Sequence, residues 1–287
     1  MTPTPGRLDV VATPIGNLAD LSPRARSALE SADLIAAEDT RHTGALLGSC
    51  GISRPLVSLH DYNERARAAG LIEQLRAGKV IALVSDAGTP LLSDPGYTLV
   101  REAAAAGIEV RAIPGPSALT AALSIAGLAT DRFAFEGFLP AAAAARRRAL
   151  AELAHEPRTL VFFEAPHRIA DVLDDLAAAF GGARPAVIAR ELTKNFETVY
   201  RGTLQELQLR ARSDPNLQRG ELVLLVAGAP RRADTGDVAL LARLLPLLAA
   251  ELPPARAAAI AAKVTGVSRD EAYRAALGNK GTEPDFR

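Results

Sequence analysis

The segment Ser85-Asp86-Ala87-Gly88-Thr89-Pro90-Leu91-Leu92-Ser93-Asp94-Pro95-Gly96 decides the fold prediction. It follows residues 80–84, an apolar run with β-branched residues and the length of a strand buried on both faces. Small and turn-forming residues after such a strand lie at the carboxyl edge of a parallel sheet, where open α/β sheets bind ligands. Gly88 allows close approach to the backbone, and Asp86 and Asp94 add carboxylates at the mouth of the loop. A tight turn without a ligand is the alternative.

The composition limits the classes of protein that fit. The chain has 287 residues, 48% of them hydrophobic, which is enough for two domains with real cores. Its 33 basic and 33 acidic residues give no net charge, so binding to a nucleic acid would depend on local patches. A single cysteine, Cys50, excludes an internal disulfide and a cysteine-rich zinc site. With no signal-peptide pattern and no apolar run of membrane-spanning length, a cytoplasmic location away from membranes is expected.

The first half of the chain alternates strands with helices, which predicts an α/β fold with a mostly parallel sheet. Strand-like runs occur at 8–12, 33–37, 56–59, 80–84 and 109–113. Polar loops follow several of them, and the loop 38–43 is predicted either to face a substrate or to be a solvated loop that pairs with itself. In the helix after the loop 60–64, Ala66, Ala69, Ile72 and Leu75 have helical spacing and form the predicted buried face.

A second α/β domain is expected after the passage at 128–132. Beyond residue 230 the pattern is purely helical, with a Ser268-x-x-Glu271 capping box opening the last helix. Two short helices joined by a glycine turn have the spacing of a helix-turn-helix, and a helical cap on the second domain is the alternative. The predicted domains are residues 1–128, 129–230 and 231–287.

Four segments together carry a family resemblance: residues 13–18 (TPIGNL), 37–43 (AEDTRHT), 85–96 and 189–194 (ARELTK). Over roughly residues 8–230, this set resembles the tetrapyrrole methylase superfamily, and within it the branch that methylates a cytidine 2′-hydroxyl of 16S rRNA near the decoding centre. The resemblance implies two α/β domains with S-adenosylmethionine in the cleft between them, and a small helical C-terminal domain. It also implies a homodimer that acts on the 30S subunit.

The resemblance further implies a cofactor site. The residues that match it are Pro14, Asp86, Ala87, Gly88, Thr89, Ser117, Ala118, Phe163, Ala189 and Arg190.

A ribose hydroxyl is a poor nucleophile until a base withdraws its proton. The candidate bases are Glu38, Asp39, His42, His60 and Asp86, and the sequence does not choose among them. Candidate phosphate contacts are Arg41, Arg146, Arg147, Arg148, Lys194, Arg269 and Arg274, although a triple arginine is also an ordinary solvated helix start. No metal site is expected, because the histidines and the cysteine lack metal-ligand spacing and transfer from a sulfonium needs no metal.

Other functions stay open at this point. A tetrapyrrole or diphthine-type methyltransferase would share the fold and cofactor, but the segments 37–43 and 189–194 favour the rRNA branch. A noncatalytic rRNA-binding assembly factor would not need the intact loops at Pro14 and Gly88. A nicotinamide oxidoreductase is disfavoured, because the chain lacks a glycine-rich dinucleotide fingerprint.

Overall fold

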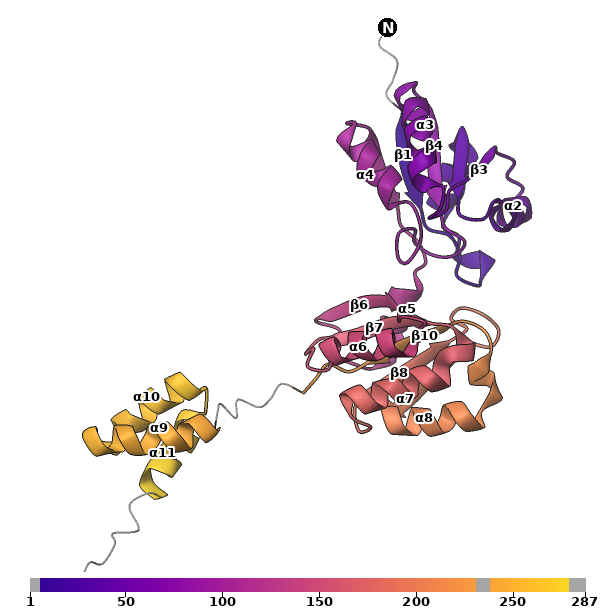
Figure 1. Ribbon diagram of the computed structural model, residues 1–287. Coiled ribbons are helices and arrows are strands. Elements are labelled where there is room, and N and C mark those ends of the chain that lie inside the picture. The colour runs from indigo at the N-terminus through magenta and orange to yellow at the C-terminus, as the bar shows by residue number, and fades with distance from the viewer. Residues whose placement is uncertain (1–5, 231–237, 279–287) are drawn as a thin grey trace, which may run out of the picture. The chain divides into compact units, whose positions relative to one another are not determined.

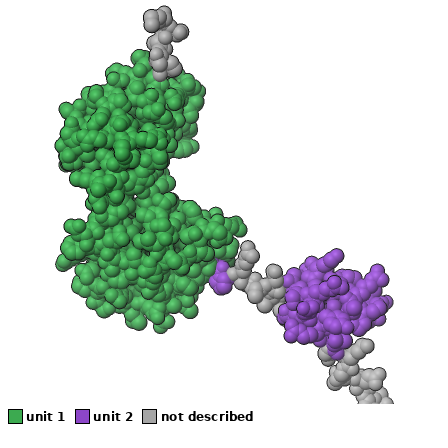
Figure 2. All heavy atoms as spheres, turned by 180° about the vertical axis from the view of Figure 1, so that it is seen from behind, with its two compact units in different colours: residues 1–228 green, residues 229–287 purple. Residues whose placement is uncertain are grey.

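The computed structural model describes residues 6–230 and 238–278 (Figure 1). The chain divides into two compact units, residues 1–228 and 229–287 (Figure 2). In the described ranges, no helix combines the length and the apolar character needed to cross a membrane.

The first sheet is entirely parallel, as predicted. Its strands run in the order β3-β2-β4-β1-β5, so β4 and β1 lie at the centre. The strands are β1 (Arg7–Val11), β2 (Leu34–Ala37), β3 (Leu56–Ser58), β4 (Val80–Val84) and β5 (Glu109–Ile113). Because all five strands run the same way, the loops that follow them meet at one edge.

Helices cover both faces of this sheet. Helices α1 (Pro23–Ser31) and α2 (Thr40–Ser49) pack on one face, and α3 (Glu64–Arg76) and α4 (Tyr97–Ala105) on the other. The predicted polar loop after β2 is shorter than expected, because Asp39 caps α2 by accepting a hydrogen bond from the Arg41 N–H at 2.8 Å. Residues 41–43 therefore lie in the first turn of a helix.

The buried face of α3 differs from the prediction. Ile72 and Leu75 are buried as expected, but Ala66 and Ala69 are exposed, and Ala68 and Leu71 are buried in their place. Glu64 explains this rotation. Its buried carboxylate accepts hydrogen bonds from the N–H groups of Thr98 at 2.6 Å and Leu99 at 3.2 Å, in the first turn of α4.

The second sheet is mixed, in the order β6-β7-β10-β8-β9. Its strands are β6 (Phe133–Phe138), β7 (Thr159–Glu164), β8 (Pro185–Arg190), β9 (Thr198–Thr203) and β10 (Leu222–Val226). Strands β6 and β7 are parallel, whereas β10 is antiparallel to both neighbours and β9 is antiparallel to β8. The antiparallel pairing suggested by the alternation in residues 197–202 is confirmed.

Four helices sandwich the second sheet. Helices α6 (Ala143–Leu153), α7 (Ile169–Phe180) and α8 (Leu204–Ser213) pack on one face, and α5 (Ala118–Ala126) on the other. Short 3₁₀ turns lie at Leu18–Asp20, Pro166–Arg168 and Pro215–Gln218. Since α5 follows β5 directly yet packs on β8 and β10, the chain passes from the first sheet to the second at residues 114–117.

The C-terminal unit has its own core. Helices α9 (Val238–Glu251), α10 (Pro254–Thr265) and α11 (Arg269–Gly278) bury mostly leucine and alanine against one another. Gly266, in the left-handed region with φ of 73°, ends α10, and the Ser268 hydroxyl accepts the Glu271 N–H at 3.2 Å to open α11. The helix boundaries agree with the sequence prediction.

Candidate functional site

The loops at the carboxyl edge of the first sheet are tied to one another. Thr13 and Gly88 exchange two backbone hydrogen bonds of 2.9 and 3.1 Å, which join the loops after β1 and β4. The Asp39 N–H donates to Oδ1 of Asp86 at 3.0 Å, and the Thr89 hydroxyl donates to the Pro116 carbonyl at 3.0 Å. The predicted convergence of these loops is therefore confirmed.

The loop after β4 holds unusual backbone conformations. Gly88 has φ of +83°, and a Cβ added there would lie 3.1 Å from Cγ2 of Ile15. Leu91 and Ser93 also lie in the left-handed region, with φ of 74° and 69°. Such conformations cost non-glycine residues about 1–2 kcal/mol each and gather at functional sites. The loop is thus held in shape by its surroundings.

A cavity of about 430 Å³ opens at this loop. It is lined by residues from the loops of the first sheet, from the start of α5 and from the ends of β7 and β8. Its charged lining side chains, within the described ranges, are all carboxylates: Glu38, Asp86, Asp94, Glu164 and Glu221. A cavity of this size and charge suits a small ligand that carries positive charge.

The start of β10 reaches the cavity because β10 runs antiparallel to its neighbours. In the sheet register, Leu222 lies opposite Glu164 and Arg190, and Val223 lies opposite Phe163 and Ala189. The segment 220–223 consequently lines the cavity together with the ends of β7 and β8. Sequence reasoning missed this segment, because nothing local indicates that the last strand is inserted between two earlier ones.

Two carboxylates that line the cavity, Asp94 and Glu38, have raised pKa values. Burial raises the pKa of Asp94 to about 6, a hydrogen bond from Ser85 opposes this rise, and the neighbouring Glu38 and Asp86 carboxylates add to it. Burial also raises the pKa of Glu38, and the charge of Asp86 contributes. A carboxylate whose pKa lies near neutrality is suited to accept and release a proton at physiological pH.

The structure brings together most of the predicted cofactor residues. Asp86, Ala87, Gly88, Thr89, Ser117, Ala118, Phe163 and Ala189 all line the cavity. Other lining residues were not predicted as site residues: Ile15, Leu92, Ser93, Asp94, Phe138 and Leu192, with residues 164–166 and 220–223. For Leu92 to Asp94 a signal existed, since they belong to the segment from which the fold was predicted.

Two predicted cofactor residues lie elsewhere. Pro14 lines a neighbouring hollow of about 310 Å³ that also includes His42 and one side of Asp86. The buried Arg190 guanidinium donates to the carbonyls of Asn216 at 2.7 Å, Arg219 at 3.0 Å and Phe196 at 3.2 Å. Because its donors already fasten two loops, the assignment of Arg190 to the cofactor is corrected to a structural role.

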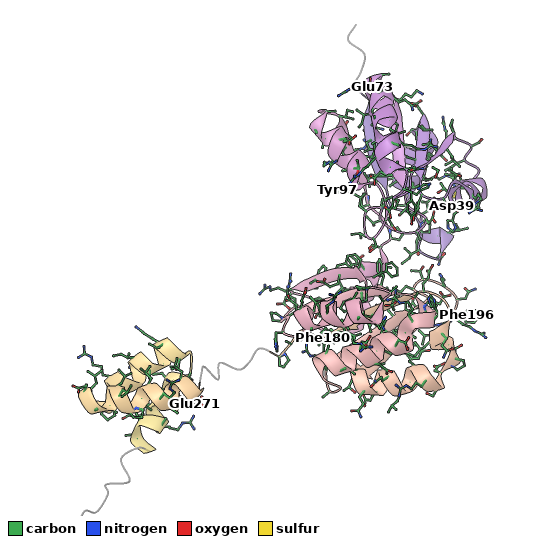
Figure 3. The ribbon with its side chains drawn as sticks, viewed as in Figure 1. Asp39, Glu73, Tyr97, Phe180, Phe196 and Glu271 are labelled. Atoms are coloured by element: carbon green, nitrogen blue, oxygen red, sulfur yellow. The ribbon has the colours of Figure 1, made fainter. Side chains whose placement is uncertain are left out.

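The five candidate bases differ in whether they line the cavity. Glu38 and Asp86 line the cavity. Asp39 is engaged outside it by the exposed Arg41, at 2.7 Å, which holds the pKa of Asp39 below its usual range (Figure 3). His42 lies in the neighbouring hollow, and His60 lies outside the cavity lining, with its Nε2 3.1 Å from Nδ2 of Asn63.

The candidate phosphate contacts differ in availability. The prediction for Arg146 is corrected, because its side chain is 6% exposed and its Nε donates to Asp175 at 2.7 Å. Lys194 is held between Glu191 and Glu221, at 2.9 Å from each. Arg147 and Arg148 are exposed on α6, although Arg147 also pairs with Asp175 at 3.1 Å. Arg269 and Arg274 are exposed on α11 of the C-terminal unit.

No group of three or more histidine, cysteine, aspartate or glutamate side chains in the described part of the chain could hold a metal ion.

Two family models match the chain. The model described as "Tetrapyrrole (Corrin/Porphyrin) Methylases" matches residues 7–208, and the model described as "RsmI C-terminal HTH domain" matches residues 235–280.

Close relatives cover nearly the whole chain. "Ribosomal RNA small subunit methyltransferase I" of Xylella fastidiosa (strain Temecula1) is 56% identical over 270 residues, which are 94% of this chain and 98% of the relative. The protein of the same name from Pseudomonas aeruginosa is 54% identical over 279 residues, or 96% of this chain and 98% of the relative.

Solved structures share the fold at low identity. Diphthine synthase superposes with a TM-score of 0.58 at 20% identity, covering 77% of this chain and 90% of that one. Uroporphyrin-III C-methyl transferase from Thermus thermophilus, complexed with S-adenyl homocysteine, gives a TM-score of 0.54 at 21% identity, covering 77% and 97%. At these identities the likeness establishes the fold alone.

Proposed function

The chain belongs to the tetrapyrrole methylase family, in the branch of ribosomal RNA small subunit methyltransferase I, and from this membership we propose that it transfers a methyl group from S-adenosylmethionine to a cytidine 2′-hydroxyl of 16S rRNA. The observation that carries the proposal is the acidic cavity at the loop after β4, in a chain more than half identical to named rRNA methyltransferases. The proposed substrate form is the assembled 30S subunit, near the decoding centre.

The residues of the cavity fit this cofactor. S-adenosylmethionine supplies an electrophilic methyl group on a positively charged sulfonium, and it carries an ammonium and only one carboxylate. Glu164 and Glu221 are paired with Arg168 at 3.4 Å and Lys194 at 2.9 Å, so the negative charge that attracts this ligand comes from Glu38, Asp86 and Asp94. The first turn of α5 begins after Ser117, whose side chain makes no cap hydrogen bond, so its backbone N–H groups suit the ligand's carboxylate.

Gly88, Phe163 and Ala189 supply the remaining contacts in this proposal. The positive φ of Gly88 and the absence of a side chain let the ligand approach the backbone of the loop. Phe163 and Ala189 bring apolar surface from the second sheet, which removes water from the reacting atoms. Holding two reactants in line is the main contribution of such a site, worth on the order of 7–11 kcal/mol in well-oriented pairs.

We assign the removal of the hydroxyl proton to the cluster Glu38, Asp86 and Asp94. All three line the cavity, and burial together with neighbouring negative charge raises the pKa of Glu38 and of Asp94, which favours the uptake of a proton by either group. This assignment keeps Glu38 and Asp86 from the five candidate bases of the sequence analysis and adds Asp94 as a new candidate.

The C-terminal unit is proposed to dock on RNA. It matches a helix-turn-helix model and exposes Arg269 and Arg274 on one helix, which are suited to phosphate contacts. The named rRNA methyltransferases extend over 94–96% of the chain, whereas the diphthine and uroporphyrin enzymes cover 77%. The greater share of the chain that the rRNA methyltransferases cover supports RNA rather than a tetrapyrrole as the substrate. A homodimer and a cytoplasmic location remain expectations, and sedimentation of the purified protein tests the first.

The test is methyl transfer from labelled S-adenosylmethionine to purified 30S subunits lacking the modification, with naked 16S rRNA in parallel. Nuclease digestion and mass spectrometry then locate the label. A methylated cytidine ribose, formed faster on subunits than on naked RNA, is the expected result. Label on a base atom, or no label on either RNA, refutes the proposal.

Two matched variants link the activity to the cavity. Asp86→Asn retains an oxygen for the Asp39 N–H but removes the negative charge, so it should fold normally and lose most activity. Asp33→Asn makes the same change at the opposite edge of the sheet, where the Asp33 carboxylate accepts the Val80 N–H at 2.8 Å. Equal loss of activity in both variants would refute the proposal that methyl transfer takes place in the cavity.

A further inference from the structure

Phe138 is exposed although it lies in a strand. Its side chain is 55% exposed, and it lines the cavity described above. The other exposed aromatic side chains of the described residues, Tyr62, Tyr97, Phe133, Phe196 and Tyr273, do not line this cavity. Tyr97 and Phe196 are labelled in Figure 3. An aromatic ring half in water at the wall of a cavity is a surface available to a flat ligand.

A β-bulge directs Phe138 to the cavity. The register of β6 against β7 shifts between Phe135 and Gly137, so Phe135 lies opposite Val161 and Phe138 lies opposite Phe163. If residues 134–138 alternated regularly with no register shift, Phe138 would share the face of Ala134, which packs in the core on the other side of the sheet. The bulge therefore places Phe135 and Phe138, three residues apart, on the cavity side.

The rings on this side form a continuous aromatic surface. Phe163 contacts Phe135 and Phe138 edge to face, with centroid distances of 4.8 and 5.8 Å. Phe163 is partly buried, so Phe138 is the outer ring of the pair that lines the cavity.

The bulge also touches the loop after β4. Gly137 has φ of +65°, and a Cβ added there would lie 3.0 Å from the Ser93 hydroxyl. Ser93 adjoins Asp94 of the carboxylate cluster, so the backbone next to Phe138 lies against the segment that carries the proposed proton acceptor.

We propose that Phe138 is the stacking platform for the base of the target nucleotide, which leaves its neighbours in the RNA and enters the cavity with its ribose. The inference rests on the proposed function. Since the carboxylates of Glu38, Asp86 and Asp94 line the cavity at the loops of the first sheet, a phosphate is disfavoured there, and the base and sugar are the parts of a nucleotide that fit. Single-stranded and splayed-out bases are commonly bound by stacking on exposed aromatic rings, which replaces the stacking lost in the RNA.

The occupant of the ring is a base from outside rather than the adenine of the cofactor. The predicted cofactor residues of the second sheet, Phe163 and Ala189, are more buried than Phe138, so the ligand held there lies deeper. The exposed ring is left for a partner that arrives from solvent.

The test compares Phe138→Ala, Phe138→Tyr and the control Phe133→Ala in steady-state methylation of 30S subunits. Phe133 lies on the same strand, is 40% exposed and does not line the cavity. Phe138→Ala should reduce kcat/KM for subunits by roughly 5- to 100-fold, the range expected when one stacked base loses its aromatic partner. Phe138→Tyr, which keeps the ring, and Phe133→Ala should remain within about threefold of wild type, a spread like that of surface substitutions.

Titration calorimetry with S-adenosylmethionine alone separates the two possible occupants. The Kd for S-adenosylmethionine should stay within about twofold of wild type in Phe138→Ala, because the ring is reserved for the RNA. If the Kd for S-adenosylmethionine rises in Phe138→Ala by the same factor as kcat/KM falls, the ring of Phe138 binds the cofactor and the inference is overturned. Unchanged kcat/KM in Phe138→Ala, or a change of oligomeric state in that variant alone, also overturns it. Inactivity of the wild-type protein on every RNA would instead refute the proposed function.

Discussion

Replacing Gly88 by alanine should damage both stability and the site, in amounts that follow from its surroundings. The backbone at Gly88 is left-handed, with φ of +83°, and this conformation costs an alanine about 1–2 kcal/mol. The new Cβ would also lie 3.1 Å from Ile15 Cγ2, so Ile15 must shift within a packed region. Such overpacking adds about 1–3 kcal/mol. The expected destabilisation is therefore about 2–5 kcal/mol.

Gly107 is the matched control for this substitution. It has a similar φ of +70°, but a Cβ there meets nothing within 4 Å. Gly107→Ala should thus show the backbone cost alone, about 1–2 kcal/mol. The difference between the two variants isolates the contact with Ile15.

Urea unfolding of both variants and calorimetry with S-adenosylmethionine make the comparison. Gly88→Ala should lose more stability than Gly107→Ala and should bind the cofactor more weakly, since the methyl group occupies the place where the ligand meets the backbone. Gly107→Ala should bind it as wild type does. Equal stability losses together with unchanged binding in Gly88→Ala would refute the reasoning about this loop.

Further predictions concern the carboxylate cluster, the buried arginine and the C-terminal unit. The pKa of Asp94 is raised from 3.8 to about 6, so its contribution to stability is present at low pH and is lost as the pH rises through about 6. Asp94→Asn should therefore gain stability over wild type between pH 5 and pH 8 in urea titrations, and a falling difference would contradict this. Arg146→Ala should cost about 1.5–3 kcal/mol, because Asp175 loses its 2.7 Å hydrogen bond from Arg146 and keeps only the exposed Arg147 at 3.1 Å, whereas the exposed Arg148→Ala should cost under about 0.5 kcal/mol by the same assay. Removal of residues 230–287 should leave cofactor affinity near wild type and impair methylation of 30S subunits, and full transfer activity by the truncated protein would exclude the docking role.

Much of the first half could be predicted because its signals are local. Apolar runs such as 80–84 and 34–37 mark strands, and parallel strands bring the loops after them to one edge whatever their order. The grouping of Asp86, Gly88 and Ser117 into one cofactor site came from the family resemblance, and it agrees with this geometry because all three line the cavity. The order β3-β2-β4-β1-β5 was not predicted, since it depends on which strands pair rather than on what each contains.

The errors came from side chains whose partners are distant in sequence. Arg146 has the local pattern of a solvated helix start, but Asp175 on α7 draws it into the protein. Arg190 is the last residue of the buried strand β8, where a ligand-binding residue could lie, and only the fold shows that carbonyls of residues 196, 216 and 219 receive its hydrogen bonds. Phe138 was not predicted as a site residue, because its place at the cavity depends on a bulge and on the pairing of β6 with β7, which no local pattern indicates.

The position of β10 sets an order of events during protein synthesis. The strand lies in the middle of the second sheet, and all five of its residues are buried, yet it is the last strand of the described chain. While the ribosome is still adding residues 204–226, β7 and β8 have no central partner, and both present unpaired backbone edges and apolar side chains. The first sheet ends at Ile113, so it can form while this second half is incomplete. A nascent chain stopped before Leu222 would thus contain one complete sheet and a second sheet without its central strand, which is prone to aggregate. The second half of the protein can be completed only when β10 has been synthesised.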